Sequence, residues 1–362
     1  MKLLLITFIC LLISCANQGL LVERVEDIPA QFGLAGAVLG KSNGVILLAG
    51  GANFSQGFPW DGGKKQFHSK AYIFNGQWQE SESPFKEPIA QGMSIETNFG
   101  LFHAGGNNGN NLLSSCFFIH WQSGKLKLDT SLPDLPIPLE TASICTDGNN
   151  VFVSGGKSSN GLSARVFQLN LKKPLKWIEL ENLPQARNLA NSFIYQDTLY
   201  VIGGYDSINS VSLIDVLVYK SDKWHKIGEV TLDKKKHAIT GSAISFINKN
   251  EVLFVGGTTG KNRIIRDHLK STIVQLDPST KESKSLREKR LKLTVEHPGH
   301  RDDMLIYNCI KNSWRLAGKL TEPSSLKTRL LPWKGSFLYI GGEIKPAVRT
   351  AHVYLIKPKN KL

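Results

Sequence analysis

Six double glycines recur along the chain and constrain its fold more than any other feature. Their first glycines stand at residues 50, 105, 155, 203, 256 and 341, so the intervals between them are 55, 50, 48, 53 and 85 residues. Each pair ends a short apolar run, for example residues 199–202 and 337–340. Short apolar runs that end in a turn signal are typical of buried strands. The 362 residues therefore predict an all-β fold built from six similar units.

A tryptophan follows several of the double glycines, near the next strand. The four are Trp78, Trp177, Trp224 and, after a longer gap, Trp314. A period near fifty residues with Gly-Gly and a later tryptophan resembles the kelch repeat. That resemblance implies one four-stranded blade for each repeat and a six-bladed β-propeller for the whole chain. Glycine suits these strand ends because the backbone turns sharply there and neighbouring blades approach closely.

The two ends of the chain are predicted to close the ring together. After Gly342 there is room for one more strand, residues 350–356, so the last blade lacks its outer strand. Residues 20–25, with the sequence LLVERV, form an apolar strand that has no blade of its own. We predict that this N-terminal strand completes the last blade, which makes residues 20–362 a single propeller.

The 85-residue interval is longer than a blade requires. It predicts an insertion at about residues 258–303, directly after the fifth double glycine. The charged middle of this insertion, residues 285–293, fits no single period, so it is either a short helix or a charged hairpin. Long loops on rigid scaffolds are usually functional or disordered. We therefore consider the insertion a candidate lid over a binding site.

The first fifteen residues read as a targeting segment. Lys2 precedes an apolar run at residues 3–13, which is too short to span a bilayer. Residues 12–15, Leu-Ile-Ser-Cys, resemble a bacterial lipobox, in which Cys15 would receive lipid and attach the protein to a membrane. The alternative is an ordinary cleaved signal peptide. Either predicts an exported protein, periplasmic or lipid-anchored. Of the remaining cysteines, Cys116 and Cys145 are predicted to be buried thiols.

The chain carries a formal net charge of +14 and has a pI near 9.5. A basic balance favours anionic partners. The lysines are scattered, apart from residues 234–236 and 284–292, so no stripe for nucleic acid is predicted. Nucleotide, P-loop and zinc motifs are absent from the sequence, and no cofactor or metal is expected. The segment 297–303, HPGHRDD, is either a metal site or a solvated loop, and its irregular spacing favours the loop.

One face of the predicted ring collects polar residues. The loop after each double glycine opens on the same face as the connection from one blade to the next. The loops after the double glycines place six residues on this face: Asn53, Asn107, Lys157, Tyr205, Thr258 and Glu343. The connections between blades add seven: Gln31, Gln91, Glu140, Arg187, Asn188, His237 and Lys327. A ligand is therefore expected on this face, around the central channel.

The segment 343–350, EIKPAVRT, resembles the catalytic stretch of the bacterial N-acetylneuraminate epimerases, sialic acid mutarotases on a six-bladed kelch propeller. That family has Glu, any residue, Lys-Pro, two further residues and Arg-Thr. The resemblance implies that Glu343 is the catalytic base and that Arg349 is the second catalytic residue, placed to bind a sugar carboxylate. Arg187, His237 and Asn53 are the candidates for further contact with the substrate.

The resemblance has departures and a rotation. Ala347 stands where the family has glycine, and Ala351 stands where it has aspartate. Residues 36–78 resemble a blade that comes late in that family, whereas residues 184–187 with 200–204 resemble an early one. The blade order is thus rotated, as in a cyclically permuted mutarotase branch. A ring can be opened at any blade, so rotation also fits the unpaired strand at residues 20–25.

The resemblance implies a cofactor-independent mutarotase that interconverts the α- and β-anomers of N-acetylneuraminate or a related small acidic sugar. Such an enzyme opens the ring by acid-base catalysis and closes it on the other face. The alternative is a non-enzymatic propeller that binds a glycan or a protein, because fold does not fix function. A copper enzyme resembling galactose oxidase is disfavoured, since the sequence offers no His/Tyr copper set.

Overall fold

Six four-stranded antiparallel sheets make up most of the chain, in a computed structural model that describes residues 19–172 and 175–359. The predicted signal segment and Cys15 lie outside the described residues. From inner to outer strand, blade 1 consists of β2 (Val38–Ser42), β3 (Val45–Ala49), β6 (Ala71–Phe74) and β7 (Trp78–Ser81). Blade 2 consists of β8 (Met93–Thr97), β9 (Gly100–Asn107), β10 (Leu112–Gln122) and β11 (Lys125–Asp129). Blade 3 consists of β12 (Ser143–Thr146), β13 (Asn150–Ser154), β16 (Val166–Asn170) and β17 (Trp177–Leu180).

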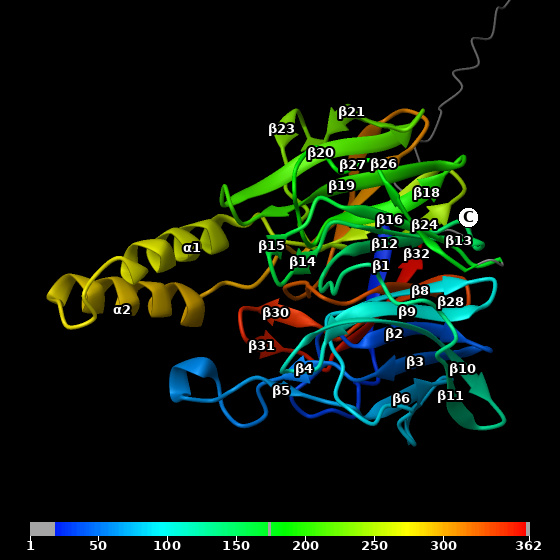
Figure 1. Cartoon of the computed structure of the whole chain (residues 1–362), viewed down its shortest axis with the longest axis horizontal. Coiled ribbons are helices and arrows are strands. Elements are labelled where there is room, and N and C mark those ends of the chain that lie inside the picture. Colours follow the sequence, from blue (N-terminus) through cyan, green and yellow to red (C-terminus); the bar gives the residue numbers. More distant parts are fainter. Residues whose placement is uncertain (1–18, 173–174, 360–362) are drawn as a thin grey trace, which may run out of the picture.

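The other three blades follow the same order, and the last one uses both ends of the chain. Blade 4 consists of β18 (Asn191–Tyr195), β19 (Thr198–Asp206), β20 (Val211–Lys220) and β21 (Lys223–Glu229). Blade 5 consists of β24 (Ala243–Asn248), β25 (Glu251–Val255), β26 (Asp303–Asn308) and β27 (Ser313–Lys319). Blade 6 consists of β28 (Leu330–Trp333), β29 (Ser336–Ile340), β32 (Val353–Pro358) and β1 (Leu20–Val25). The predicted six-bladed propeller is confirmed (Figure 1).

Short hairpins extend several blades beyond their sheets. They are β4 (Ala52–Asn53) with β5 (Gln66–Phe67), β14 (Lys157–Ser158) with β15 (Gly161–Leu162), β22 (Thr231–Leu232) with β23 (Lys235–Lys236), and β30 (Glu343–Lys345) with β31 (Val348–Arg349). A single turn of 3₁₀ helix, Pro59–Asp61, lies between β4 and β5. The pairs β14–β15 and β30–β31 lie on the left side of the ring in Figure 1.

The hydrophobic core lies between neighbouring blades rather than within one sheet. Phe102 of blade 2 and Phe167 of blade 3 belong to one buried cluster and are fully buried. The alternation of strand side chains explains this, because each sheet turns one face to the preceding blade and the other to the next. Cys116, Cys145 and Cys309 are free and buried in these layers, as expected for the first two.

The double glycines permit the close approach of one blade to the next. Gly105 and Gly155 have φ of 64° and 69°, in the left-handed region that favours glycine. A side chain at Gly155 would place its first carbon 2.4 Å from the carbonyl oxygen of Arg187 in the following connection. The glycines are therefore required both by the backbone conformation and by the space available.

Three of the four repeat tryptophans join consecutive blades. The indole N–H of Trp177 donates to the carbonyl of Pro133, at 3.0 Å, and that of Trp224 donates to the carbonyl of Glu181, at 2.9 Å. Each acceptor lies in the connection that leaves the preceding blade. Trp78 makes the same bond to Glu26, at 3.2 Å. The kelch tryptophan thus fixes the spacing between blades.

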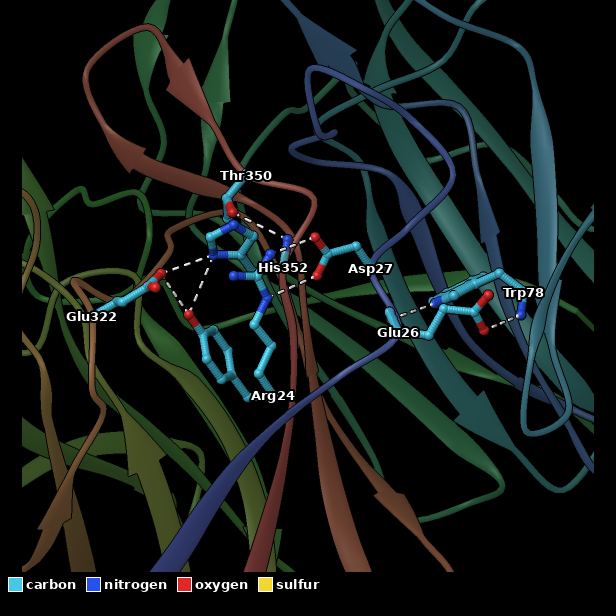
Figure 2. A network of polar contacts seen from close by, with 8 residues as sticks. Arg24, Glu26, Asp27, Trp78, Glu322, Thr350 and His352 are labelled. Carbon is cyan, nitrogen blue, oxygen red and sulfur yellow. Dashed lines mark hydrogen bonds and ion pairs between the residues drawn. The ribbon is translucent and has the colours of Figure 1, made fainter.

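The ring closes through the N-terminal strand, as predicted. β1 pairs antiparallel with β32, from Leu20 opposite Pro358 to Val25 opposite Val353. Figure 2 shows the chain just beyond this strand, where Glu26 reaches blade 1 and its carboxylate accepts from the backbone N–H of Trp78 at 3.0 Å. In the same view Arg24 pairs with Asp27, at 2.6 Å. The N-terminal segment therefore ties blade 6 to blade 1.

The insertion after β25 is a helical hairpin. Its helices are α1 (Lys261–Val274) and α2 (Lys281–Val295), and the charged segment 285–293 lies within α2. Thr280 caps α2 by accepting from the N–H of Ser283 at 3.1 Å. Only Leu269 and Ser283 are buried in the two helices, which project from the ring in Figure 1. Of the described helices, none has the length and apolar character to cross a membrane.

Candidate active site

The mouth of the channel is built from six equivalent backbone contacts. The residue after each double glycine forms a bridge to the residue that precedes the turn into the inner strand, for example Lys157 to Glu140 and Glu343 to Leu326. The next residue is left-handed in all six blades: Gly36, Gln91, Thr141, Leu189, Gly241 and Lys327 have φ between 54° and 71°. At five of the six steps around the ring, the N–H of this left-handed residue donates to the carbonyl of the left-handed residue in the preceding blade. These bonds hold the rim in a fixed geometry.

A cavity of about 330 Å³ lies over this rim, between the propeller and the helical hairpin. This volume falls in the range of small-molecule sites, about 300–1,000 Å³. Five basic side chains line it, and two carboxylates oppose them: Lys65, Lys157, Arg263, Arg266 and Lys327 against Glu140 and Glu343. Glu140 is already paired with Lys157, at 3.1 Å. The remaining excess of positive charge favours an anionic ligand.

Glu343 is the first residue of β30, directly after the sixth double glycine. Its Oε2 lies 2.6 Å from Nη1 of Arg349, which stands opposite it on β31, and 3.4 Å from Nζ of Lys327. Among the described residues, Oε1 makes no hydrogen bond, and the bond from Lys327 goes to Oε2. The side chain is 13% exposed. One oxygen is thus held by two cations while the other is free to meet a ligand.

The surroundings of Glu343 keep it ionised. Burial raises the pKa of this carboxyl, but the charges of Lys327, Arg349 and His300 outweigh burial and hold the pKa at about 2. At neutral pH the side chain is therefore a carboxylate, which can accept a proton.

Arg349 holds Glu343 rather than lining the cavity. Its side chain is 4% exposed, and its Nε donates to the carbonyl of Ala52 at 3.4 Å. The guanidinium also lies over the ring of Phe54, 5.2 Å from its centroid. The predicted pair of Glu343 and Arg349 is brought together as an ion pair, although Nη1 makes no hydrogen bond among the described residues, and the guanidinium is nearly enclosed by protein groups. A carboxylate of a ligand would have to be bound by other cations.

The helical hairpin supplies four cavity residues that sequence reasoning did not assign: Arg263, Arg266, His297 and His300. Arg263 stacks on the ring of Tyr205 at 3.7 Å. The buried Nε of Arg266 has no partner among the described residues. The histidines belong to the segment interpreted as a solvated loop, yet they face the cavity. The available signal was the origin of the insertion at Thr258, a position already expected on the site face.

The three predicted substrate-contact residues do not line this cavity. Arg187 is fully buried, and its guanidinium bonds Asp215 at 2.7 and 2.9 Å and the carbonyl of Gly203 at 3.0 Å. Its role is to brace blade 4. Nε2 of His237 lies 3.1 Å from Oδ2 of Asp303. Asn53 donates to the carbonyl of Gly33 and accepts from His68 at 2.8 Å, if the proton is on that ring nitrogen.

A second cavity, of about 430 Å³, runs down the channel between the inner strands. Gln91, Thr141, Leu189 and Lys327 line both cavities, so the site opens into the channel. No group of three or more His, Cys, Asp or Glu side chains that could hold a metal occurs in the described ranges.

Comparison with known proteins places the chain in a family. A family model described as N-acetylneuraminate epimerase matches residues 132–361, which include blades 3 to 5 and the part of blade 6 that carries Glu343 and Arg349. Curated proteins named N-acetylneuraminate epimerase align over 233 residues at 30% identity in Salmonella typhi and 28% in Salmonella paratyphi B. One from Yersinia enterocolitica aligns over 232 residues at 23% identity.

These alignments do not cover the whole of either partner. They span 62% of this chain and 58% of each Salmonella relative, and 61% and 56% for the Yersinia protein. The family model begins in the connection between blades 2 and 3 and leaves the first two blades outside the match. The rotated blade order stays a prediction. The chain belongs to the N-acetylneuraminate epimerase family.

Proposed function

We propose that the protein is a mutarotase that interconverts the α- and β-anomers of N-acetylneuraminate or a related acidic sugar, without a cofactor. The observation that carries the proposal is the ionised carboxylate of Glu343, with one free oxygen, at the edge of a cavity rich in cations. Membership of an epimerase family supports the reaction type. The targeting segment at residues 1–15 makes an exported protein part of the proposal.

The reaction needs a base and an acid at one carbon atom. Glu343 takes the proton of the anomeric hydroxyl, the bond between the anomeric carbon and the ring oxygen breaks, and a carbonyl forms. The ring oxygen gains a proton from an acid. After rotation about the adjacent bond, the hydroxyl attacks the other face of the carbonyl, and both proton transfers run in reverse. A positioned acid or base contributes about 10²–10⁴-fold to such a step.

The cations have two different tasks in this proposal. Arg349 and Lys327 hold one oxygen of Glu343, so that the other points at the sugar. Arg266 and Arg263 of α1, with Lys327, offer charge-assisted hydrogen bonds to the sugar carboxylate. A carboxylate bound there offsets positive charge near Glu343. The pKa of Glu343 then rises from its low value and makes this carboxylate a better base.

The test follows freshly released α-N-acetylneuraminate by proton NMR, with and without the purified protein lacking residues 1–15. The wild type should accelerate the approach to anomeric equilibrium. Glu343→Gln should reduce the acceleration by about 10²–10⁴-fold while the sugar still binds. Glu80→Gln, at an exposed position of β7, is the matched control and should keep the wild-type rate.

Each outcome of this test decides something. Acceleration that survives Glu343→Gln would keep the activity and remove Glu343 as the base. Sugar binding without acceleration in the wild type would favour the alternative, a propeller that binds glycans without chemistry. Neither binding nor acceleration, with N-acetylneuraminate and other acidic sugars, would contradict both.

A further inference from the structure

We propose that His300 is the second proton-transfer residue of the site, the acid that protonates the ring oxygen while Glu343 takes the anomeric proton. The inference rests on the proposed function and deepens it. It assigns a catalytic role to the helical hairpin, because His300 lies in the segment that returns from α2 to the propeller. The hairpin would then complete the active site rather than only cover it.

His300 is held beside Glu343 by the backbone. Its N–H donates to the carbonyl of Ile344, the residue after Glu343, at 3.0 Å. The next residue, Arg301, donates to the carbonyl of Gly257 at 2.9 Å. On the other side, Gly299 has φ of 100° and packs so closely on Pro323 that a side chain would collide with it. The backbone of His300 is therefore held beside that of Glu343 by blades 5 and 6.

The imidazole of His300 is unpaired in the part of the chain that the structure describes. Both ring nitrogens are buried, and neither has a hydrogen bond among the described residues. The neighbouring histidine differs, because Nδ1 of His297 accepts from the N–H of Gly299 at 3.1 Å. Burying a polar group without a partner costs free energy. A ligand that fills the cavity would supply the missing partner, and both His300 and Glu343 line that cavity.

The groups that face His300 explain how it would become an acid. Burial lowers the pKa of His300 to about 4, the charge of Glu343 raises it, and His297, Lys327 and Arg266 lower it. The ring of His297 is 5.4 Å away. A sugar carboxylate on Lys327 and Arg266 would offset two of these positive charges, so the pKa of His300 would move up towards neutrality. An anionic substrate would thus produce the acid that its own reaction needs.

The proton balance closes over one turnover. The site starts with protonated His300 and ionised Glu343. Ring opening moves the anomeric proton to Glu343 and the His300 proton to the ring oxygen. Ring closure moves the new hydroxyl proton back to His300 and returns the Glu343 proton to the anomeric oxygen. No oxidant, reductant or co-reactant is required.

The experiment compares His300→Gln with His268→Gln, an exposed histidine on α1 of the same hairpin. We expect His300→Gln to lower kcat by about 10²-fold or more, with KM within about threefold of wild type. The wild-type kcat should fall on the alkaline side as His300 loses its proton, and the variant should lack this limb. Added imidazole should restore part of the rate in His300→Ala. His268→Gln should match the wild type throughout.

The outcomes separate this inference from the proposed function. A wild type that does not accelerate equilibration contradicts both. An active wild type with an active His300→Gln removes His300 alone, and a rise in KM without loss of kcat would make it a binding residue. If His300→Gln does not fold, nitrogen-15 NMR of histidine in the wild type decides. The acidic sugar should protonate one buried imidazole, whereas its neutral methyl ester should not; no change with either would overturn the proposal.

Discussion

Three arginines of the site face have different roles because their surroundings differ. Arg187 is enclosed and neutralised by Asp215, so it braces a blade. Arg349 is paired with Glu343 and positions the carboxylate. Arg266 lines the cavity, and its one side-chain bond among the described residues is the long one from Nη1 to Thr294, at 3.4 Å, so its guanidinium is available to a ligand. The residue type alone does not separate these roles. The roles differ because each arginine has a different carboxylate, or none, as its hydrogen-bond or ion-pair partner among the described residues.

Ala347 is a second case in which the surroundings decide. It stands in the turn between β30 and β31 with φ of 66°, where the related epimerases have glycine by the resemblance above. The left-handed region costs a non-glycine residue about 1–2 kcal/mol. Glycine avoids this cost, but it raises the conformational entropy of the unfolded chain, which lowers the stability by about 0.4–1 kcal/mol. Ala347→Gly should therefore raise the free energy of unfolding, measured by urea denaturation, by up to about 1.6 kcal/mol.

The matched control for this substitution is Ala351→Gly, four residues further on and not in a left-handed conformation. There the entropic loss of about 0.4–1 kcal/mol is expected, together with the loss of packing by the methyl group of Ala351, which lies against a buried cluster of blades 6 and 1. Equal losses in both variants would show that the turn carries no strain at Ala347.

At the scale of elements, two segments that lie outside the repeat make the propeller complete. β1 supplies the outer strand of blade 6, and Leu20 and Val22 pack against the buried cluster that contains Tyr354 and Ile356. The helical hairpin supplies His300 and the arginines of the cavity. The first segment serves stability and the second serves the site, since the hairpin buries little against the ring.

Removal of β1 should therefore destabilise the ring. We expect a protein that starts at residue 26 to lose at least about 3 kcal/mol of unfolding free energy, from exposed apolar surface and an unpaired β32 edge. Thermal and denaturant unfolding measure the loss. A protein that starts at residue 19 keeps the strand and is the control. Equal melting temperatures for the two would contradict closure by β1.

At the scale of the whole molecule, the charge distribution acts with the shape. The chain has a net charge of +14, and the cavity shares this sign. Clefts lined by one sign of charge attract ligands of the other sign, and salt screens this attraction. The scattered lysines thus contribute to a field even though they form no stripe for nucleic acid.

Salt should weaken binding of an acidic sugar. The screening length falls from about 10 Å at 0.1 M to about 3 Å at 1 M salt. We expect the Kd of N-acetylneuraminate for Glu343→Gln, measured by calorimetry, to rise several-fold over this range. The Kd of its methyl ester should change little. A Kd of the acid that is independent of salt would show that the basic lining does not contact the carboxylate.

Most of the architecture could be predicted because local sequence patterns indicate it. Apolar runs, double glycines and tryptophans repeat at one period, and each acts on residues nearby in the chain or in the adjacent blade. The same holds for Glu343 and Arg349, which a short hairpin of seven residues brings together. The strand at residues 20–25 was assigned by counting, since five blades were complete and one lacked an edge.

The sequence by itself therefore determined the six blades, their closure and the hairpin that carries Glu343. Only the tertiary structure decided which side chains share the cavity. His300 and Arg266 reach Glu343 because a helical hairpin leaves blade 5 and returns beside blade 6, and Arg187 is withdrawn because Asp215 lies 28 residues away on β20. Burial, unpaired atoms and shifted pKa values depend on such distant neighbours, and no local pattern records them.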